Sequence, residues 1–213
     1  LRLNVWTSGL KDGEKRPVPV WLHGGGFAKG NGIEQDGYNG ENIARRRDIV
    51  FCSINHRLNA FGFTDLSSVG GEKYRHSANV GMLDIVAALE WVRDNIENFG
   101  GDPSNVTIMG QSGGGSKVCM LAAMPSARGL FHKAVALSGD AVRANDATYS
   151  AELGEAVLAE AGLDAAQVDS LERMPWEDYL EVAMRAQRKF RGSSGYRAGF
   201  APVGNDIDIP SGE

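Results

Sequence analysis

Residues Val106–Gly114, with the sequence VTIMGQSGG, place a short β-rich run directly before a glycine-rich turn. The turn fits the pattern Gly-x-Ser-x-Gly, with Ser112 at its centre. This pattern presents a serine at the end of a sheet, on a turn so tight that side chains two residues before and after it would clash. A helix that follows the turn also points its N–H groups at the charge that develops during attack. The pattern therefore predicts a nucleophilic Ser112, and the alternative is a glycine-rich helix start without chemistry.

A second motif lies in the N-terminal part of the chain. The run Val18–Leu22 leads into His23-Gly24-Gly25-Gly26-Phe27. Glycines after a strand leave backbone N–H groups free to donate to an oxyanion, as in the HGGG-type loops that supply part of an oxyanion hole. Such a loop taken by itself is also compatible with a plain glycine turn. Two motifs in this order indicate acyl-transfer chemistry.

The apolar pattern alternates between strand-like and helix-like segments. Five short β-rich runs are bounded by turn residues: Leu1–Trp6, Val18–Leu22, Ile49–Ile54, Val106–Met109 and Ala134–Leu137. Helical patterns cover Ala78–Phe99 (with Ser77 as a candidate N-cap), the segment after Ser112, and two stretches of Ser150–Phe190 separated near Met174-Pro175. This alternation predicts an α/β fold, in which a mostly parallel sheet carries helices on both faces. From about Gly192 onward we expect coil.

Composition excludes several classes of protein. The net charge of −5 and the pI of about 5.4 disfavour nucleic acid as a partner. No stretch approaches the ~20 apolar residues of a membrane span. Two cysteines do not form a disulfide framework. Leu1 begins inside a strand-like alternation, so we expect a truncated N-terminus, and the localisation stays open between cytoplasmic and secreted.

The glycines and histidines do not match the common cofactor and metal motifs. A P-loop fails because Lys117 stands one place late and no hydroxyl residue follows it. The dinucleotide pattern fails because Lys29 occupies the position of its third glycine. The four histidines, His23, His56, His76 and His132, are far apart and show no metal-ligand spacing. We therefore expect no metal and no organic cofactor.

Sequence blocks along nearly the whole chain resemble one family, the type-B carboxylesterases, and especially its bacterial para-nitrobenzyl-esterase-like members. The blocks are Leu3–Trp6, His23–Phe27, Ser53–Leu58, Phe61–Phe63, Asn79–Asp84, Asn98–Ser112, Gly129–His132 and Phe200–Val203. The resemblance implies an α/β-hydrolase fold in which the five runs are the second to sixth core strands. It implies Ser112 as the nucleophile and an oxyanion hole from the N–H groups of Gly25, Gly26 and Gly113. It also implies a carboxylic ester as the small-molecule substrate, without a cofactor.

The resemblance further implies that residues 1–213 are a partial catalytic domain, truncated at both ends, whose partner is the missing C-terminal half of the same protein. In this fold the triad follows the chain order Ser, then Asp or Glu, then His. The acid and the base are therefore expected beyond Glu213, and the isolated chain is expected to be inactive or nearly so. His132 is the only histidine after Ser112, and we expect it at the opposite end of the sheet.

The other histidines and some departures from the family pattern have structural interpretations. His23 is interpreted as an orienting residue of the oxyanion loop, whereas His56 and His76 are interpreted as loop residues. Gln111 stands where the family usually has Glu, which removes a charge beside the nucleophile. Asp84 matches a family aspartate that we interpret as a buried structural partner.

Two other functions compete with ester hydrolysis. Some relatives of this fold have become non-catalytic, cholinesterase-like binding or adhesion modules. Those relatives usually lose the nucleophile, whereas this chain keeps Ser112. Amide or carbamate hydrolysis by the same machinery is the other alternative, and the sequence does not separate it from ester hydrolysis.

Overall fold

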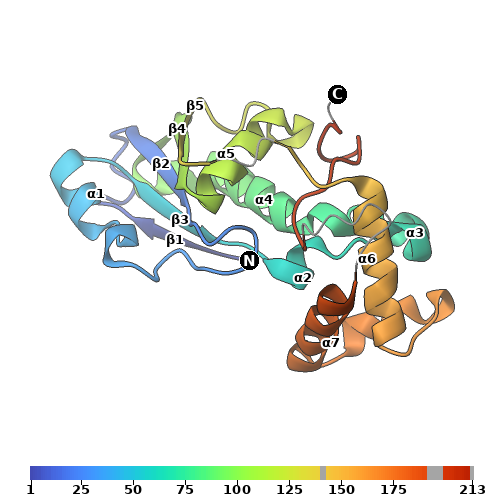
Figure 1. Cartoon of the computed structure of the whole chain (residues 1–213). Helices are drawn as coiled ribbons and strands as arrows, with labels where there is room; N and C mark the ends of the chain where they lie inside the picture. Colours follow the sequence, from blue (N-terminus) through green and yellow to red (C-terminus); the bar gives the residue numbers. More distant parts are fainter. Residues whose placement is uncertain (140–142, 191–198, 212–213) are drawn as a thin grey trace. The chain divides into compact units, whose positions relative to one another are not determined.

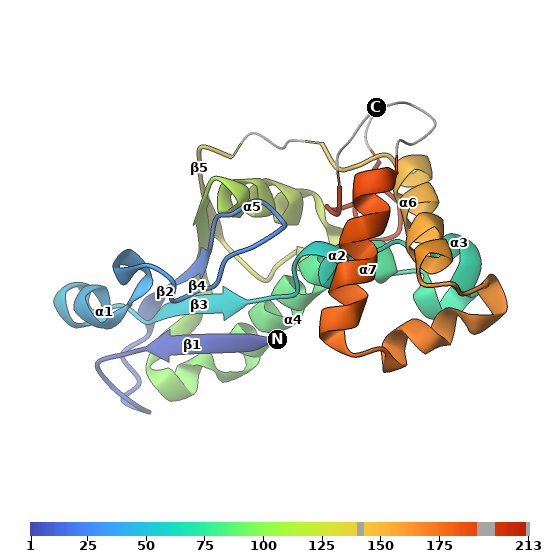
Figure 2. The same ribbon diagram turned by 60° about the horizontal axis from the view of Figure 1, so that its bottom comes forward.

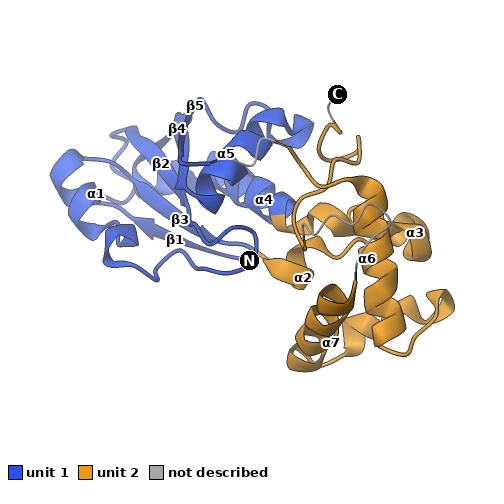
Figure 3. Ribbon diagram, viewed as in Figure 1, with its two compact units in different colours: residues 1–56, 82–142 blue, residues 57–81, 143–213 orange. Residues whose placement is uncertain are grey.

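The computed structural model describes residues 1–139, 143–190 and 199–211. The chain consists of two compact units (Figure 3). Unit 1 contains Leu1–His56 and Met82–Val142, and unit 2 contains Arg57–Gly81 and Arg143–Glu213.

Unit 1 is built on a five-stranded sheet with the strand order β1-β3-β2-β4-β5 (Figures 1 and 2). The strands are β1 (Arg2–Trp6), β2 (Arg16–Leu22), β3 (Phe51–Asn55), β4 (Gly101–Gln111) and β5 (Lys133–Leu137). β1 runs antiparallel to β3, and every other pair of neighbours is parallel. The predicted, mostly parallel sheet is thus confirmed. β4 begins five residues earlier than the apolar run indicated.

The register between the two central strands brings the predicted motifs together. Val18, Val20 and Leu22 of β2 are fully buried, as expected for a strand at the centre of a parallel sheet. Leu22, the last residue of β2, lies opposite Gly110 near the end of β4. Because both strands run in the same direction, the segments that follow them emerge side by side at the carboxyl ends of the strands.

Three α-helices belong mainly to unit 1: α1 (Glu41–Arg47), α4 (Val80–Asn95) and α5 (Gly113–Ala123). α5 packs against β4 and β5. The single helix expected over Ala78–Phe99 is α-helical only in its middle, since Ser77–Asn79 and Ile96–Phe99 are 3₁₀ turns. Ser77 does not cap it, because its hydroxyl accepts the Leu66 N–H at 2.8 Å.

Unit 2 is helical. The α-helices in its described residues are α2 (Asn59–Phe63), α3 (Ser67–Gly70), α6 (Ala147–Glu160) and α7 (Trp176–Lys189). The sequence predicted two helices over Ser150–Phe190, and a third helical segment, the 3₁₀ helix Ala165–Arg173, lies between them. The other 3₁₀ turns in the described residues are Asp36–Tyr38, Gly71–Tyr74 and Pro125–Ala127.

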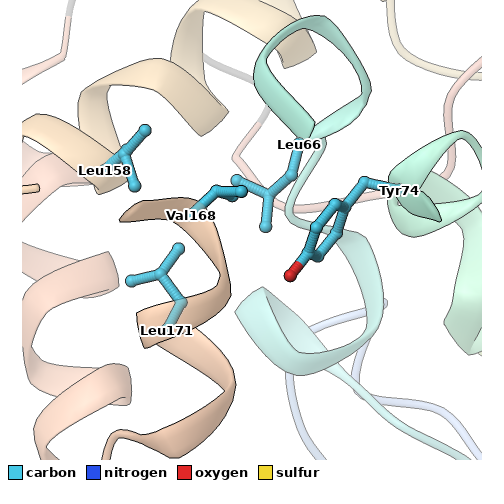
Figure 4. Close-up of a cluster of buried hydrophobic side chains, with 5 residues drawn as sticks. All are labelled: Leu66, Tyr74, Leu158, Val168 and Leu171. Atoms are coloured by element: carbon cyan, nitrogen blue, oxygen red, sulfur yellow. The ribbon is translucent and has the colours of Figure 1, made fainter. Parts of the chain in front are cut away.

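One apolar cluster holds the helices of unit 2 together. Figure 4 shows its buried side chains, which are Leu66, Tyr74, Leu158, Val168 and Leu171. They come from four separate segments, so the cluster joins the residues before α4 to those after β5. Of the expected coil beyond Gly192, residues 192–198 lie outside the described residues, and 199–211 contain no helix or strand apart from an isolated bridge at Val203.

β5 forms an exposed border of the sheet. All five of its residues are solvent-exposed, including Val135 at 40% and Leu137 at 44%. Within the described ranges no strand pairs with its outer edge. No helix in the described part of the chain has the length and apolar character needed to cross a membrane.

Candidate active site

Ser112 occupies the turn between β4 and α5. β4 ends at Gln111, and α5 begins at Gly113. The Ser112 backbone has φ 56° and ψ −123°, which a residue with a side chain adopts only when its surroundings impose it. Its N–H donates to the Leu137 carbonyl at 2.8 Å, which ties the turn to the end of β5. The residue is exposed to solvent.

Gly110 and Gly114, two residues before and after Ser112, lie so close to other backbone atoms that there is no room for a side chain. A Cβ atom on Gly110 would lie 2.5 Å from the carbonyl carbon of Gly114. A Cβ atom on Gly114 would lie 2.0 Å from the Leu22 oxygen. The turn therefore closes on itself and on the end of β2, as the Gly-x-Ser-x-Gly pattern predicted.

The loop His23–Phe27 follows β2 at the same end of the sheet as Ser112, where the strands β2 and β4 end. Its Gly25 and Gly26 adopt positive φ values of 81° and 63°. A Cβ atom on Gly24 would lie 3.7 Å from the Ser112 Cβ, so the loop passes directly beside the nucleophile. A Cβ atom on Gly113 would lie 2.4 Å from the Gly26 Cα, so α5 begins against the same loop. Convergence of the Gly25, Gly26 and Gly113 N–H groups on one point stays a prediction.

The chain that carries this arrangement of loop, turn and helix also matches a known protein family over nearly its whole length. Residues 1–211 match the model of the carboxylesterase family. The chain belongs to the carboxylesterase family. The resemblance inferred from the sequence blocks is therefore confirmed.

Individual carboxylesterases show how far the similarity extends. The chain is 45% identical to para-nitrobenzyl esterase of Bacillus subtilis over 167 residues, which cover 78% of this chain and 33% of the relative. It is 36% identical to phenmedipham hydrolase of Pseudarthrobacter oxydans over 211 residues, or 99% of this chain and 40% of the relative. The chain thus spans about a third to two fifths of the length of these relatives.

Solved carboxylesterase structures agree with the fold. An esterase from Clostridium hathewayi that hydrolyses aliphatic aromatic polyesters matches with a TM-score of 0.88 and 45% identity, over 99% of this chain and 42% of that one. The Geobacillus stearothermophilus carboxylesterase EST55 matches with a TM-score of 0.85 and 37% identity, over 97% and 42%. The fold is the α/β-hydrolase fold of this family, as predicted.

His23 has the surroundings of a structural residue of the His23–Phe27 loop. Its ring is fully buried and stacks on His56, with the ring centroids 5.0 Å apart. Nδ1 lies 2.8 Å from the Gly24 carbonyl oxygen. Because a carbonyl only accepts, Nδ1 must carry the proton and donate. Burial, assisted by the nearby Lys117 charge, lowers the His23 pKa and so favours the neutral ring.

Neither His132 nor His76 is placed as a general base. His132 precedes β5, its N–H donates to the Val106 carbonyl at 2.8 Å, and its Nδ1 accepts the Val106 N–H at 3.2 Å. This is the amino end of the parallel strands, opposite to Ser112, as predicted. In unit 2, His76 Nδ1 lies 2.7 Å from an Asp208 carboxylate oxygen, while its Nε2 accepts from Arg75 at 2.8 Å. Both of its ring nitrogens are engaged.

Lys117 is a residue of the site that the sequence reasoning missed. It appeared there only as a misplaced P-loop lysine, yet its side chain is fully buried. Its Nζ donates to the His23 carbonyl at 3.0 Å and lies 5.8 Å from the centroid of the Phe27 ring. Burial lowers the Lys117 pKa to about 7, against a smaller opposing effect of Glu34. Lys117 is the fifth residue after Ser112. Nothing in the sequence around it indicated that its side chain would be buried against the His23 carbonyl.

The remaining predicted positions have plain surroundings. Gln111 is exposed, and its Oε1 would lie 3.6 Å from a Cβ atom on Gly24. Asp84 is buried. In the part of the chain that the structure describes, no three His, Cys, Asp or Glu side chains cluster as a metal site.

Proposed function

We propose that this chain is the nucleophile-bearing part of a serine-dependent carboxylic ester hydrolase. The observation that carries the proposal is the strained, exposed Ser112 beside the Gly24–Gly26 loop. Strain of this kind gathers at functional sites, and membership of the carboxylesterase family agrees with it.

The reaction proceeds through an acyl-enzyme in two steps. Ser112 Oγ attacks the ester carbonyl carbon and gives its proton to a general base. The N–H groups of Gly25, Gly26 and Gly113 stabilise the oxyanion of the tetrahedral intermediate. The C–O bond to the alcohol then breaks, and the leaving oxygen takes the proton from the base. Water attacks the acyl-enzyme in the same way and releases the carboxylic acid and free Ser112.

The acid and the base come, in this proposal, from a segment beyond this chain. The relatives named above are two and a half to three times as long as the parts that match. In this fold both residues follow the nucleophile in the chain, and the described surroundings of His132 and His76 do not suit a base. Residues 1–213 would therefore be a partial catalytic domain, which is joined to its remainder in the full-length esterase. A binding-module function is disfavoured because Ser112 and the turn between β4 and α5 that carries it, here called the elbow, are intact.

A fluorophosphonate probe tests the nucleophile directly. In the full-length esterase, the probe should label Ser112, located by peptide mass spectrometry, and Ser112→Ala should remove both labelling and p-nitrophenyl ester hydrolysis. Ser116→Ala is the matched control, since it removes a buried hydroxyl one turn further along α5. Labelling that survives in Ser112→Ala would place the nucleophile elsewhere. A parallel assay with p-nitroanilide and carbamate substrates separates ester hydrolysis from its amide and carbamate alternatives.

A further inference from the structure

The orientation of an oxyanion donor is determined by the carbonyl on the same peptide unit. A trans peptide is planar, and its C=O and N–H point in opposite directions. The described residues contain no cis peptide. Whatever holds the carbonyl of residue i therefore also fixes the direction of the N–H of residue i+1.

In the loop after β2, three successive carbonyls are held in this way. Lys117 Nζ donates to the His23 oxygen at 3.0 Å, and His23 Nδ1 donates to the Gly24 oxygen at 2.8 Å. The Gly25 oxygen accepts the Ala28 and Lys29 N–H groups, both at 3.3 Å. These contacts fix the N–H groups of Gly24, Gly25 and Gly26, respectively. The last two are the donors that the proposed function requires.

Only the first of these contacts comes from another secondary-structure element, since Ala28 and Lys29 directly follow the loop. Lys117 lies on α5, whose first residue, Gly113, supplies the third proposed donor. A hydrogen bond from α5 to the start of the loop therefore links the element that carries Gly113 to the element that carries Gly25 and Gly26. It also holds the backbone of His23, whose ring in turn holds Gly24.

The chemistry of Lys117 argues against a purely packing role. An amine in an apolar interior is costly unless it is hydrogen-bonded, and a Leu or Met would fill the same space without that cost. The Lys117 amine donates its hydrogen bond to the His23 carbonyl. Ionisable groups under such strain occur preferentially at functional sites.

We infer that Lys117 is a positioning residue of the oxyanion hole: its buried amine braces the His23–Gly24 peptide against α5, and so holds the loop donors in register with Gly113. This inference rests on the proposed function. Lys117 touches no reacting atom and acts through the loop.

The test compares Lys117→Met, which keeps the length and removes the donor, with Lys117→Gln, which keeps a neutral donor. In the full-length esterase, Lys117→Met should lower kcat by about tenfold to a hundredfold, less than the ~10²–10³ loss caused by deleting one oxyanion donor. KM should change less than about twofold, because the substrate ground state does not use these donors. Lys117→Gln should recover part of kcat.

A trifluoromethyl ketone inhibitor supplies a second readout. Its adduct with Ser112 places an oxyanion in the hole, so its inhibition constant should weaken by the same factor as kcat/KM in Lys117→Met. An unchanged kcat and an unchanged inhibition constant in the folded variant would overturn the inference. An inactive, unlabelled wild-type esterase would instead overturn the proposed function.

A measurement on the unaltered esterase covers the case in which Lys117→Met does not fold. In a carbon and nitrogen NMR titration, the Lys117 Cε, the His23 carbonyl carbon and the Gly24 amide nitrogen should shift with one shared midpoint. His23 and Glu34 are the other ionisable groups that act on Lys117, so their own carbon signals are followed in the same series. A Gly24 amide that ignores the Lys117 midpoint, or follows that of His23 or Glu34, would overturn the inference.

Discussion

Gly113 and Gly26 are in such close contact that a Cβ atom on Gly113 would stand 2.4 Å from the Gly26 Cα. The two residues belong to different elements, the start of α5 and the loop after β2. Their contact means that the nucleophile and the proposed oxyanion donors are packed as one piece of backbone, with no side chain between them. Catalysis by preformed dipoles requires this kind of fixed geometry.

The closest backbone approach at the elbow predicts a large effect on stability. In Gly114→Ala the new Cβ would meet the Leu22 oxygen at 2.0 Å, and neither backbone has a flexible end that could move aside. We expect the free energy of unfolding to fall by about 3 kcal/mol, measured by urea denaturation. Gly37→Ala is the control, because nothing lies within 4 Å of its Cβ, and its change should stay within about 0.5 kcal/mol. Similar losses in the two variants would contradict the packing argument.

His132 should matter for stability and not for turnover. His132→Ala leaves the Val106 N–H without its acceptor, which should cost about 1 kcal/mol of unfolding free energy. His132→Asn offers a replacement acceptor and should restore part of that loss. In the full-length esterase kcat should remain within about twofold of the parent value for both variants. A tenfold loss of kcat in folded His132→Ala would make this histidine part of the mechanism.

The isolated chain should be a poor esterase. Without the base, Ser112 stays a neutral alcohol, and only the backbone donors and substrate binding assist the reaction. Residual acceleration over water of about 10³–10⁴ is expected, by analogy with triad-deleted proteases. A p-nitrophenyl ester assay on the purified chain, with Ser112→Ala beside it, measures this. Turnover equal to that of the full-length esterase, and lost in the alanine variant, would reveal a base within these 213 residues.

Burial of Lys117 predicts that stability depends on pH. Its pKa is about 7 in the folded chain and near 10.5 when exposed. Between these values the unfolded state binds more protons than the native state, so stability rises with pH. We expect the unfolding free energy of the parent, relative to Lys117→Met, to increase from pH 7 to pH 10 in urea titrations. The His23 pKa is lowered by burial and by the Lys117 charge, so that ring titrates below this range. A constant difference across the range would mean that Lys117 is not buried.

The open border of the sheet predicts self-association of the isolated chain. An unpaired, apolar strand edge is a template for pairing with another copy, and Val135 on β5 is 40% exposed. Val135→Lys should therefore shift the sedimentation profile toward monomer. Ile33→Lys is the control, since Ile33 is 60% exposed but lies outside the sheet. Equal solubilisation by the two lysines would point to net charge and not to the strand edge.

The parts of the fold that were predictable from the sequence depend on local pattern. The elbow at Ser112 was recognisable because the steric reason for its glycines lies within five consecutive residues. The order of β2, its loop and β4 followed from the apolar runs. The N-cap prediction for Ser77 was wrong because its hydroxyl is used by the N–H of Leu66, a partner set by the tertiary structure.

Two further residues show where a sequence signal was missed and where none existed. Asp164 and Gln167 form a capping box that begins the 3₁₀ helix between α6 and α7, and this spacing was legible in the sequence. Lys117 contacts a carbonyl 94 positions away. Nothing in the helical pattern around it distinguishes a buried lysine from a solvated one.

Among the described residues no strand covers the outer edge of β5, and this affects the order of events during synthesis on the ribosome. Chains emerge at roughly 5–20 residues per second, and N-terminal parts fold first. The elbow, the glycine loop and the five strands β1–β5 have all been translated once β5 has left the exit tunnel. The edge of β5 must then wait for any strand that is translated later. During that interval the nascent protein exposes the unpaired edge of β5, although the turn that carries Ser112 has already been translated. This is the stage at which binding by a chaperone would protect the chain most from aggregation.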